Sequence, residues 1–210
     1  MKCWEVYVYG LIISLMSLSL VSDRVFESLI FLPEAVMNGQ YWRIFTHPFV
    51  HVSWYHLFID ATAFFLLYMQ LAEESLIKRT AYVFGCGIFS LLAVIAAFPV
   101  LESVGYCGLS GIGHGLMAVC SLELIRSKTS DKTIRQTGIL CIGLVTSKCL
   151  YEVFTGQMVF SFFHSDMIGC PVAASHAGGL IGGVIMYVFF NGFSFVKTKC
   201  LNPESFVLKC

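Results

Sequence analysis

Two short glycine-rich segments each hold a residue that could take part in nucleophilic catalysis. Ser110 lies in the segment Gly-Leu-Ser-Gly-Ile-Gly-His-Gly, and His176 lies in the segment Ser-His-Ala-Gly-Gly-Leu-Ile-Gly-Gly. A serine hydroxyl is a weak nucleophile until a histidine within hydrogen-bond distance takes its proton. Taken singly, such a serine is ordinarily a packing residue of an apolar helix, and such a histidine is ordinarily a hydrogen-bonded core residue.

The spacing of the glycines favours the catalytic interpretation. Gly111 and Gly115 stand four positions apart, so they share one face of a helix. The same spacing occurs in two more pairs: Gly178 with Gly182, and Gly179 with Gly183. Because small residues at this spacing let two helix backbones approach closely, the two segments are predicted to pack together. Ser110 and His176 would then lie at similar depth, and a helix that begins at Ser110 would leave backbone N–H groups free to face an anion.

A third polar segment, residues 47–60, contains three histidines and an aspartate. His47 and His51 are predicted to share a helical face, as are His56 and Asp60, because each pair is four positions apart. Histidines at this spacing can bind zinc, but the His-Glu-x-x-His arrangement of metalloproteases is missing and no third ligand is obvious. No metal site is therefore predicted, and His47 and His51 could equally form hydrogen bonds in the membrane interface.

A fourth feature is a pair of opposite charges inside an apolar stretch. Lys148 and Glu152 are four positions apart, so their side chains meet on one helical face. They are predicted to neutralise each other as a structural pair, and no catalytic role is assigned to them.

The composition shows what kind of molecule must position these residues. The chain has 210 residues with no net charge, 57% hydrophobic residues, 12% charged residues and a mean hydropathy of +0.79. Soluble domains carry roughly 25% charged residues. A soluble globule, a nucleic-acid-binding protein and a disordered chain are therefore excluded, and the lipid bilayer is the expected surrounding.

Six apolar segments are predicted to span the membrane as helices of one all-α domain, residues 1–210, because a span needs about 20 mostly apolar residues. They are 6–22, 47–71, 80–101, 109–125, 138–156 and 172–196. The first is expected to be an anchor and not a cleaved signal peptide, because no Ala-x-Ala-like site ends it.

The basic residues predict the orientation of this bundle. Most of them fall on the loops and ends that would share one side: Lys2, Lys78, Arg79, Arg126, Lys128, Lys132, Arg135, Lys197, Lys199 and Lys209. The opposite side holds only Arg24 and Arg43. Lysine and arginine accumulate on the cytoplasmic side of membrane proteins, so both termini are expected to be cytoplasmic.

In order along the chain, these features resemble the rhomboid family of intramembrane serine proteases, and the resemblance covers nearly the whole sequence. Four motifs carry it: Trp42-Arg43, the histidine-rich segment 47–60, Gly108-Leu109-Ser110-Gly111, and Ser175-His176-Ala-Gly-Gly179. The resemblance implies a rhomboid-like six-helix bundle. It also implies a serine–histidine dyad, with Ser110 as the nucleophile, His176 as the general base and no third acid, metal or cofactor.

The same resemblance implies an oxyanion site at the start of the fourth span. His56 would help to hold the oxyanion together with the Ser110 N–H, next to Gly108 of the motif. Asp60 departs from the family, which usually has asparagine there, and an ionised carboxylate only accepts hydrogen bonds. Asp60 would therefore be kept protonated by burial or would orient His56, and orientation is the favoured interpretation. His114 is a second departure, because many family members have tyrosine under the catalytic histidine.

Within the family, the short chain and the Gly-Leu-Ser-Gly-x-x-His-Gly run are most similar to the rhombosortase subgroup. The resemblance implies an enzyme of the bacterial inner membrane whose site faces the periplasm. Its substrates would be membrane-anchored proteins that end in a Gly-Gly motif, a hydrophobic helix and a basic tail. The alternatives are a general rhomboid protease of single-pass proteins, a non-catalytic rhomboid-like protein that binds membrane clients, and a small transporter with a His/Asp proton relay.

The nine cysteines are scattered, and most are expected to act as small buried hydrophobes. Cys107 and Cys170 fall in exterior loops close to Ser110 and His176. In an oxidising compartment, a disulfide between them would pin the two catalytic helix ends together.

Overall fold

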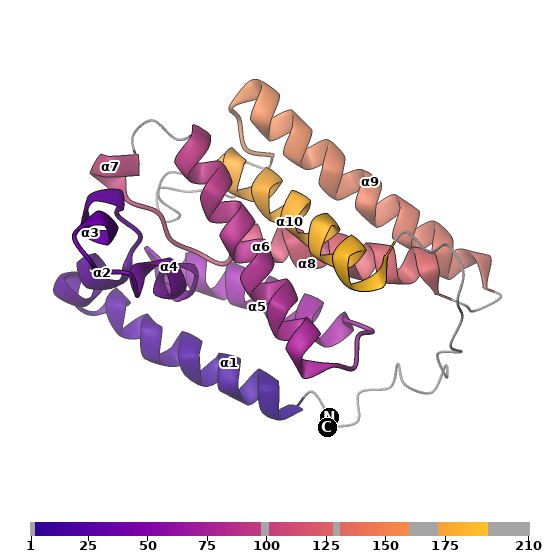
Figure 1. Cartoon of the computed structure of the whole chain (residues 1–210), viewed down its shortest axis with the longest axis horizontal. Coiled ribbons are helices and arrows are strands. Elements are labelled where there is room, and N and C mark those ends of the chain that lie inside the picture. Colours follow the sequence, from indigo (N-terminus) through magenta and orange to yellow (C-terminus); the bar gives the residue numbers. More distant parts are fainter. Residues whose placement is uncertain (1–2, 98–100, 128–130, 160–171, 193–210) are drawn as a thin grey trace.

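The structure is a computed structural model that describes residues 3–97, 101–127, 131–159 and 172–192. Within these ranges the chain is helical apart from turns and one isolated antiparallel bridge between Phe31 and Tyr106. The longer helices are α1 (Cys3–Met16), α5 (Trp54–Gln70), α6 (Leu76–Ala97), α8 (Ser110–Arg126), α9 (Lys132–Thr155) and α10 (Ala173–Asn191). The shorter ones are η1 (Ser17–Leu20), α2 (Asp23–Leu29), α3 (Pro33–Met37), α4 (Arg43–Thr46), η2 (His47–Phe49) and α7 (Leu101–Val104) (Figure 1).

Several of these helices are long and apolar enough to cross a membrane. By length and composition α6, α9 and α10 each qualify, and Arg43–Phe49 together with Trp54–Gln70 would make a fourth, bent span. The segment Trp4–Leu20 is a shorter apolar helix. The chain is therefore an all-helical integral membrane protein in the part that the structure describes. Each of the six predicted segments overlaps one of the longer helices, while the count of six spans and the cytoplasmic termini stay predictions.

The helix of the second predicted segment begins later than expected. α5 begins only at Trp54, after a bend of 96° from the preceding helical turns. Ser53 has an extended backbone and caps the new helix, because its side chain accepts the backbone N–H of His56 at 3.1 Å. His47 consequently lies in η2 and His51 in the bend. The prediction that these two histidines share a helical face is wrong.

The Trp42-Arg43 motif belongs to this bend and ties it to the apolar segment before it. The backbone carbonyls of four successive residues, 27–30, at the end of α2 accept hydrogen bonds from side chains of residues 42–46. The pairs are Arg43 to Glu27 and Ile30 (2.6 and 2.7 Å), Trp42 to Ser28 (3.0 Å) and Thr46 to Leu29 (2.8 Å). The last carbonyls of a helix have no partner within it, so these bonds both complete α2 and hold it against α4.

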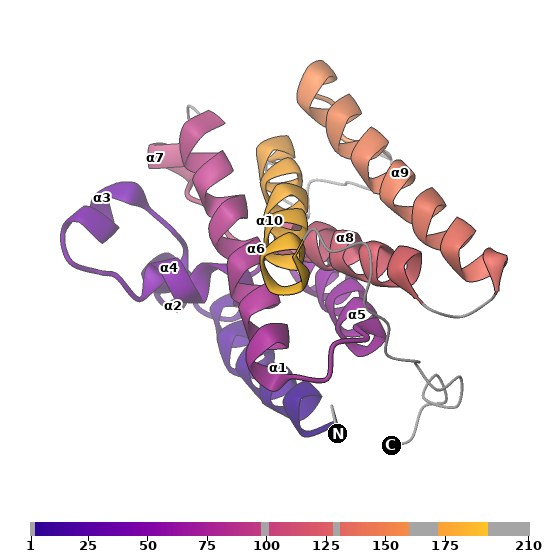
Figure 2. The same ribbon diagram turned by 45° about the vertical axis from the view of Figure 1, so that its right-hand side comes forward.

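Helix α8 lies at the centre of the bundle. It packs against α5, α6, α9 and α10, and α10 also packs along α6. Figures 1 and 2 show α9 and α1 on opposite sides of this group. α9 comes close to α8 at Gly138, where a Cβ atom would lie 2.7 Å from the Ser121 carbonyl oxygen. Many of its apolar side chains are exposed, including Ile139, Leu144 and Phe154, as expected for a helix that faces lipid.

The crossing of α8 and α10 depends on glycine. A Cβ atom on Gly115 would lie 2.6 Å from the Gly179 carbonyl oxygen, which is closer than side chains approach backbone. Cβ atoms on Gly179 and Gly183 would overlap the carbonyl oxygens of Gly111 and Gly115. The predicted close packing of the two glycine stripes is therefore confirmed, and the two backbones touch with no side chain between them.

We predict that Gly115→Ala destabilises the protein, whereas Gly113→Ala in the same helix does not. The new methyl group at 115 must push α10 or Cys86 aside, and overpacking of this kind costs about 1–3 kcal/mol. Nothing lies within 4 Å of a Cβ at 113, and alanine favours a helix over glycine by about 1 kcal/mol. The measurement is the unfolding midpoint in detergent, and equal midpoints for the two variants would contradict the prediction.

Candidate active site

Ser110 is the first residue of α8, at the end of a glycine turn that only glycine can form. Gly108 has a φ of +110°, a region that other residues rarely adopt, and its N–H donates to the His47 carbonyl at 3.1 Å. A Cβ atom on Gly108 would lie 3.1 Å from the His56 ring and 3.2 Å from an Asp60 oxygen. The turn thus presses the backbone before Ser110 against α5. The N–H groups of the first turn of α8 have no partner within the helix, so they can face an anion.

Asp60 joins this turn to two histidines. Its Oδ2 atom accepts the backbone N–H of Leu109 at 2.9 Å, and lies 3.3 Å from His56 Nε2 and 3.5 Å from His51 Nε2. Asp60 and His56 are four apart on α5, as predicted, while His51 reaches the same oxygen from the bend. All three contacts converge on one oxygen atom, so the carboxylate fixes the His56 ring beside Gly108.

His176 lies on α10 next to the start of α8. The carbonyl of the preceding residue, Ser175, would lie 2.9 Å from a Cβ atom on Gly111, the residue after Ser110. The ring of His114 stacks on the ring of His176, with centroids 4.0 Å apart and planes 15° apart. His114 Nδ1 also lies 2.7 Å from the Ser110 carbonyl oxygen. The structure thus brings the serine turn and the histidine to the same level, with His114 in contact with both.

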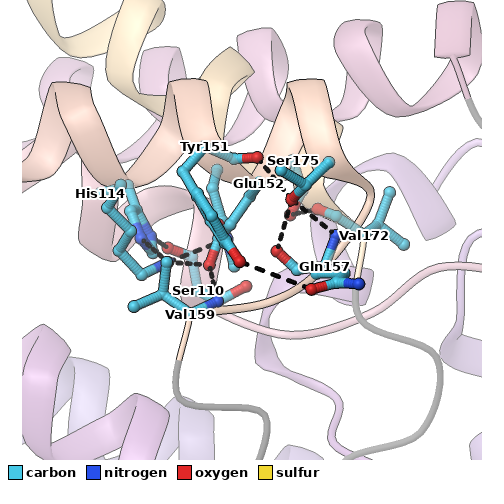
Figure 3. A network of polar contacts seen from close by, with 11 residues as sticks. Ser110, His114, Tyr151, Glu152, Gln157, Val159, Val172 and Ser175 are labelled. Carbon is cyan, nitrogen blue, oxygen red and sulfur yellow. Dashed lines mark hydrogen bonds and ion pairs between the residues drawn. The ribbon is translucent and has the colours of Figure 1, made fainter.

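Glu152 contacts this histidine from a third helix, α9. Its Oε2 lies 2.7 Å from His176 Nδ1, and its Oε1 accepts from Lys148 Nζ at 2.7 Å and from the Val159 N–H at 3.2 Å. Figure 3 shows Glu152 in a polar network with Ser110 and His114 at one end. The predicted pair of Lys148 and Glu152 is present, and its carboxylate also contacts His176, which the sequence analysis did not predict. The only feature of the sequence that could have indicated this contact is the presence of two ionisable residues inside an apolar segment.

Three of these side chains have the spacing of metal ligands. One ligand atom each from His114, Glu152 and His176 lies within 4.8 Å of the other two. Lys148 Nζ lies among them, however, 3.0 Å from His114 Nε2, 2.7 Å from Glu152 Oε1 and 3.4 Å from His176 Nδ1. The ammonium group occupies the place where a cation would bind. These residues therefore fit an internal ion pair better than a metal.

Fold and site together define a helical membrane protein with a serine and a histidine on two glycine-packed helices. Residues 38–192 match the family model described as the rhomboid domain. This range covers most of the chain, which therefore belongs to the rhomboid family.

Curated proteins with related sequences carry protease names. The chain is 29% identical over 154 residues to the rhomboid protease GlpG of Serratia proteamaculans, which covers 70% of this chain and 47% of that protein. It is 26% identical over 165 residues to rhomboid-like protease 1 of Toxoplasma gondii, covering 76% and 50%. It is 24% identical over 210 residues to rhomboid-type serine protease 2 of Kluyveromyces lactis, covering 95% and 69%. The chain spans about half the length of the first two relatives.

The predicted disulfide involves a residue that the structure does not describe. Cys107 lies in the turn before Ser110, and Cys170 lies outside the described residues. The bridge therefore stays a prediction.

We predict that Asp60→Asn keeps the protein stable and that Asp60→Leu does not. An amide oxygen can take the place of Oδ2 and accept the Leu109 N–H, whereas leucine leaves that buried donor unsatisfied at a cost of about 1–3 kcal/mol. The measurement is again the unfolding midpoint in detergent. A fall of similar size in both variants would show that the charge of Asp60, and not its acceptor oxygen, holds the turn.

Proposed function

We propose that this rhomboid-family protein is an intramembrane serine endopeptidase in which Ser110 is the nucleophile and His176 is the general base. The observation that carries the proposal is the contact of both residues with His114, at the crossing where α8 and α10 touch through glycine. A base on a neighbouring helix is what a serine needs in order to attack a peptide carbonyl.

The reaction would proceed through an acyl-enzyme. His176 takes the hydroxyl proton as Ser110 attacks the carbonyl carbon, and the resulting oxyanion faces the first turn of α8. The Ser110 N–H would hold this oxyanion, and His56 would join it from Nδ1 when both ring nitrogens carry a proton, because Nε2 faces Asp60. His176 then returns the proton to the leaving amine, and water cleaves the ester in the reverse sequence. Each donor aimed at the oxyanion contributes about 2.7–4 kcal/mol to the stabilisation of the transition state.

A cysteine near the serine is a poor rival as nucleophile. Burial and the Asp60 carboxylate raise the pKa of the Cys107 thiol to about 12. The reactive form of cysteine is the thiolate, so Cys107 stays protonated and unreactive at neutral pH. Ser110, by contrast, is in contact with His114, whose ring stacks on the proposed base.

The finer assignment that we propose is rhombosortase activity at the outer face of a bacterial inner membrane. A substrate with a Gly-Gly site at the end of a hydrophobic helix would suit a half-buried serine, because glycine lowers the cost of leaving the helix. A basic tail after that helix would remain on the cytoplasmic side. The Gly-Leu-Ser-Gly-x-x-His-Gly run supports this assignment over a general rhomboid protease of single-pass proteins.

A non-catalytic protein that binds membrane clients is the second candidate, since the fold alone would serve it. The structure favours the protease, because a mere binding protein does not require a histidine stacked beside the serine turn.

We predict that Ser110→Ala abolishes reaction with a fluorophosphonate probe, whereas Ser121→Ala in the same helix leaves it unchanged. Ser121 only donates to the Met117 carbonyl of its own helix, at 2.7 Å. His176→Ala is expected to abolish the reaction as well, and His114→Ala to reduce it in part, because His114 only supports the base. The measurement is labelling of the purified protein in detergent. Full labelling of the Ser110→Ala protein would reject the proposed nucleophile.

We predict that the wild-type protein in liposomes cleaves a reporter anchored by a Gly-Gly site, a hydrophobic helix and a basic tail. Replacement of Gly-Gly by Leu-Leu in the reporter should slow cleavage, because leucine ranks next to alanine as a helix former and glycine is about 0.8–1 kcal/mol less favourable than alanine. Gel analysis of the released domain is the measurement. Equal cleavage of both reporters would contradict the rhombosortase assignment and leave a general rhomboid protease.

A further inference from the structure

A carboxylate that the proposed mechanism does not use lies against the proposed base. Glu152 is fully buried on α9, a helix whose other side faces lipid, and its Oε2 is 2.7 Å from His176 Nδ1. An ionisable side chain inside a membrane-spanning helix is costly and is rarely present without a function. The two residues come from different helices, so their contact is formed only by the folded bundle.

The contact determines which nitrogen of His176 carries its proton. Glu152 accepts from Lys148 Nζ and the Val159 N–H as well, so it acts as an ionised acceptor at each of its contacts. A carboxylate cannot donate, so Nδ1 of His176 must be the protonated nitrogen. The lone pair is then at Nε2, which is the atom left to take the proton of a serine hydroxyl.

Lys148 has the role of a counter-ion and not of a second base. Its Nζ is 3.4 Å from His176 Nδ1, but both of these groups are donors, so no hydrogen bond joins them. Its partners are Glu152 and His114 Nε2, at 2.7 and 3.0 Å. His114 in turn donates from Nδ1 to the Ser110 carbonyl. A continuous chain of contacts therefore runs from the serine turn through His114, Lys148 and Glu152 to His176.

We propose that Glu152 is the positioning residue of a Ser110–His176–Glu152 triad, with Lys148 as its fixed counter-ion. The inference rests on the proposed function of Ser110 and His176. Glu152 selects the tautomer of the base, holds the orientation of its ring, and stabilises the imidazolium that forms when His176 takes the serine proton. Because Lys148 neutralises the carboxylate, the principal effect of Glu152 is on tautomer and orientation.

The test is the rate of fluorophosphonate labelling of the full-length protein in detergent, resolved into the maximal rate and the half-saturating probe concentration. Glu152→Gln is expected to lower the maximal rate by about 10²–10⁴-fold, because an amide can donate to Nδ1 and favour the wrong tautomer. The half-saturating concentration should stay within about threefold, since Glu152 does not touch the probe. Ser110→Ala is measured in parallel.

A matched double variant separates positioning from a structural role. Glu152→Gln alone leaves the Lys148 charge unpaired, so the fold could suffer for that reason. Glu152→Gln combined with Lys148→Met removes both charges and is expected to restore the unfolding midpoint but not the labelling rate. A labelling rate within about threefold of wild type, in the folded single variant or in the double variant, would overturn the triad. Labelling of Ser110→Ala would instead reject the proposed nucleophile, whatever the Glu152 variants show.

Discussion

The contact of two helix backbones, with no side chain between them, is the constraint on which the rest of the structure depends. α8 and α10 meet at Gly111, Gly115, Gly179 and Gly183, so their axes and their relative depth are fixed by van der Waals contact alone. Ser110 opens one of these helices and His176 lies one turn into the other. Small residues that look inert in the sequence therefore determine whether the two reactive groups can face each other.

Polar side chains around this crossing join other helices to it. Inside the lipid bilayer these polar groups have no water to bind. Asp60 ties α5 to the turn before α8, and Glu152 ties α9 to α10. At another place in the bundle, the buried carboxylate of Glu5 pairs with Arg79 and so joins α1 to α6. An ionised side chain in the bilayer costs about 2.5–3.5 kcal/mol on insertion scales. The partners of these side chains are therefore important for the stability of the bundle. Polar contacts thus add to the apolar packing that joins these helices.

Much of this arrangement could be predicted from residue spacing. The glycine stripes, the helix that begins at Ser110 and the pair of His56 and Asp60 on one helical face all follow from short-range periodicity, which the sequence displays directly. The second predicted segment is bent and not one continuous helix, because the cap at Ser53 starts a new helix after the bend. The contact of Glu152 with the base could not be predicted either. α9 is apolar on the side that faces lipid and on the side that faces protein, so its sequence does not indicate which residues turn towards α10.

The close approach of α9 to α8 at Gly138 affects Glu152, the proposed positioning residue. Glu152 follows Gly138 by about four helical turns, so the two residues lie on nearly the same side of α9, roughly 20 Å apart along its axis. The contact of Gly138 with the Ser121 carbonyl thereby fixes the rotation of α9 about its axis, and this rotation directs Glu152 towards His176. One residue inserted or deleted between Gly138 and Lys148 would rotate Glu152 about the helix axis by about 100°, together with its lysine counter-ion. The length of this stretch therefore helps to set the geometry of the proposed catalytic site, although many of its side chains are exposed on the surface of the bundle.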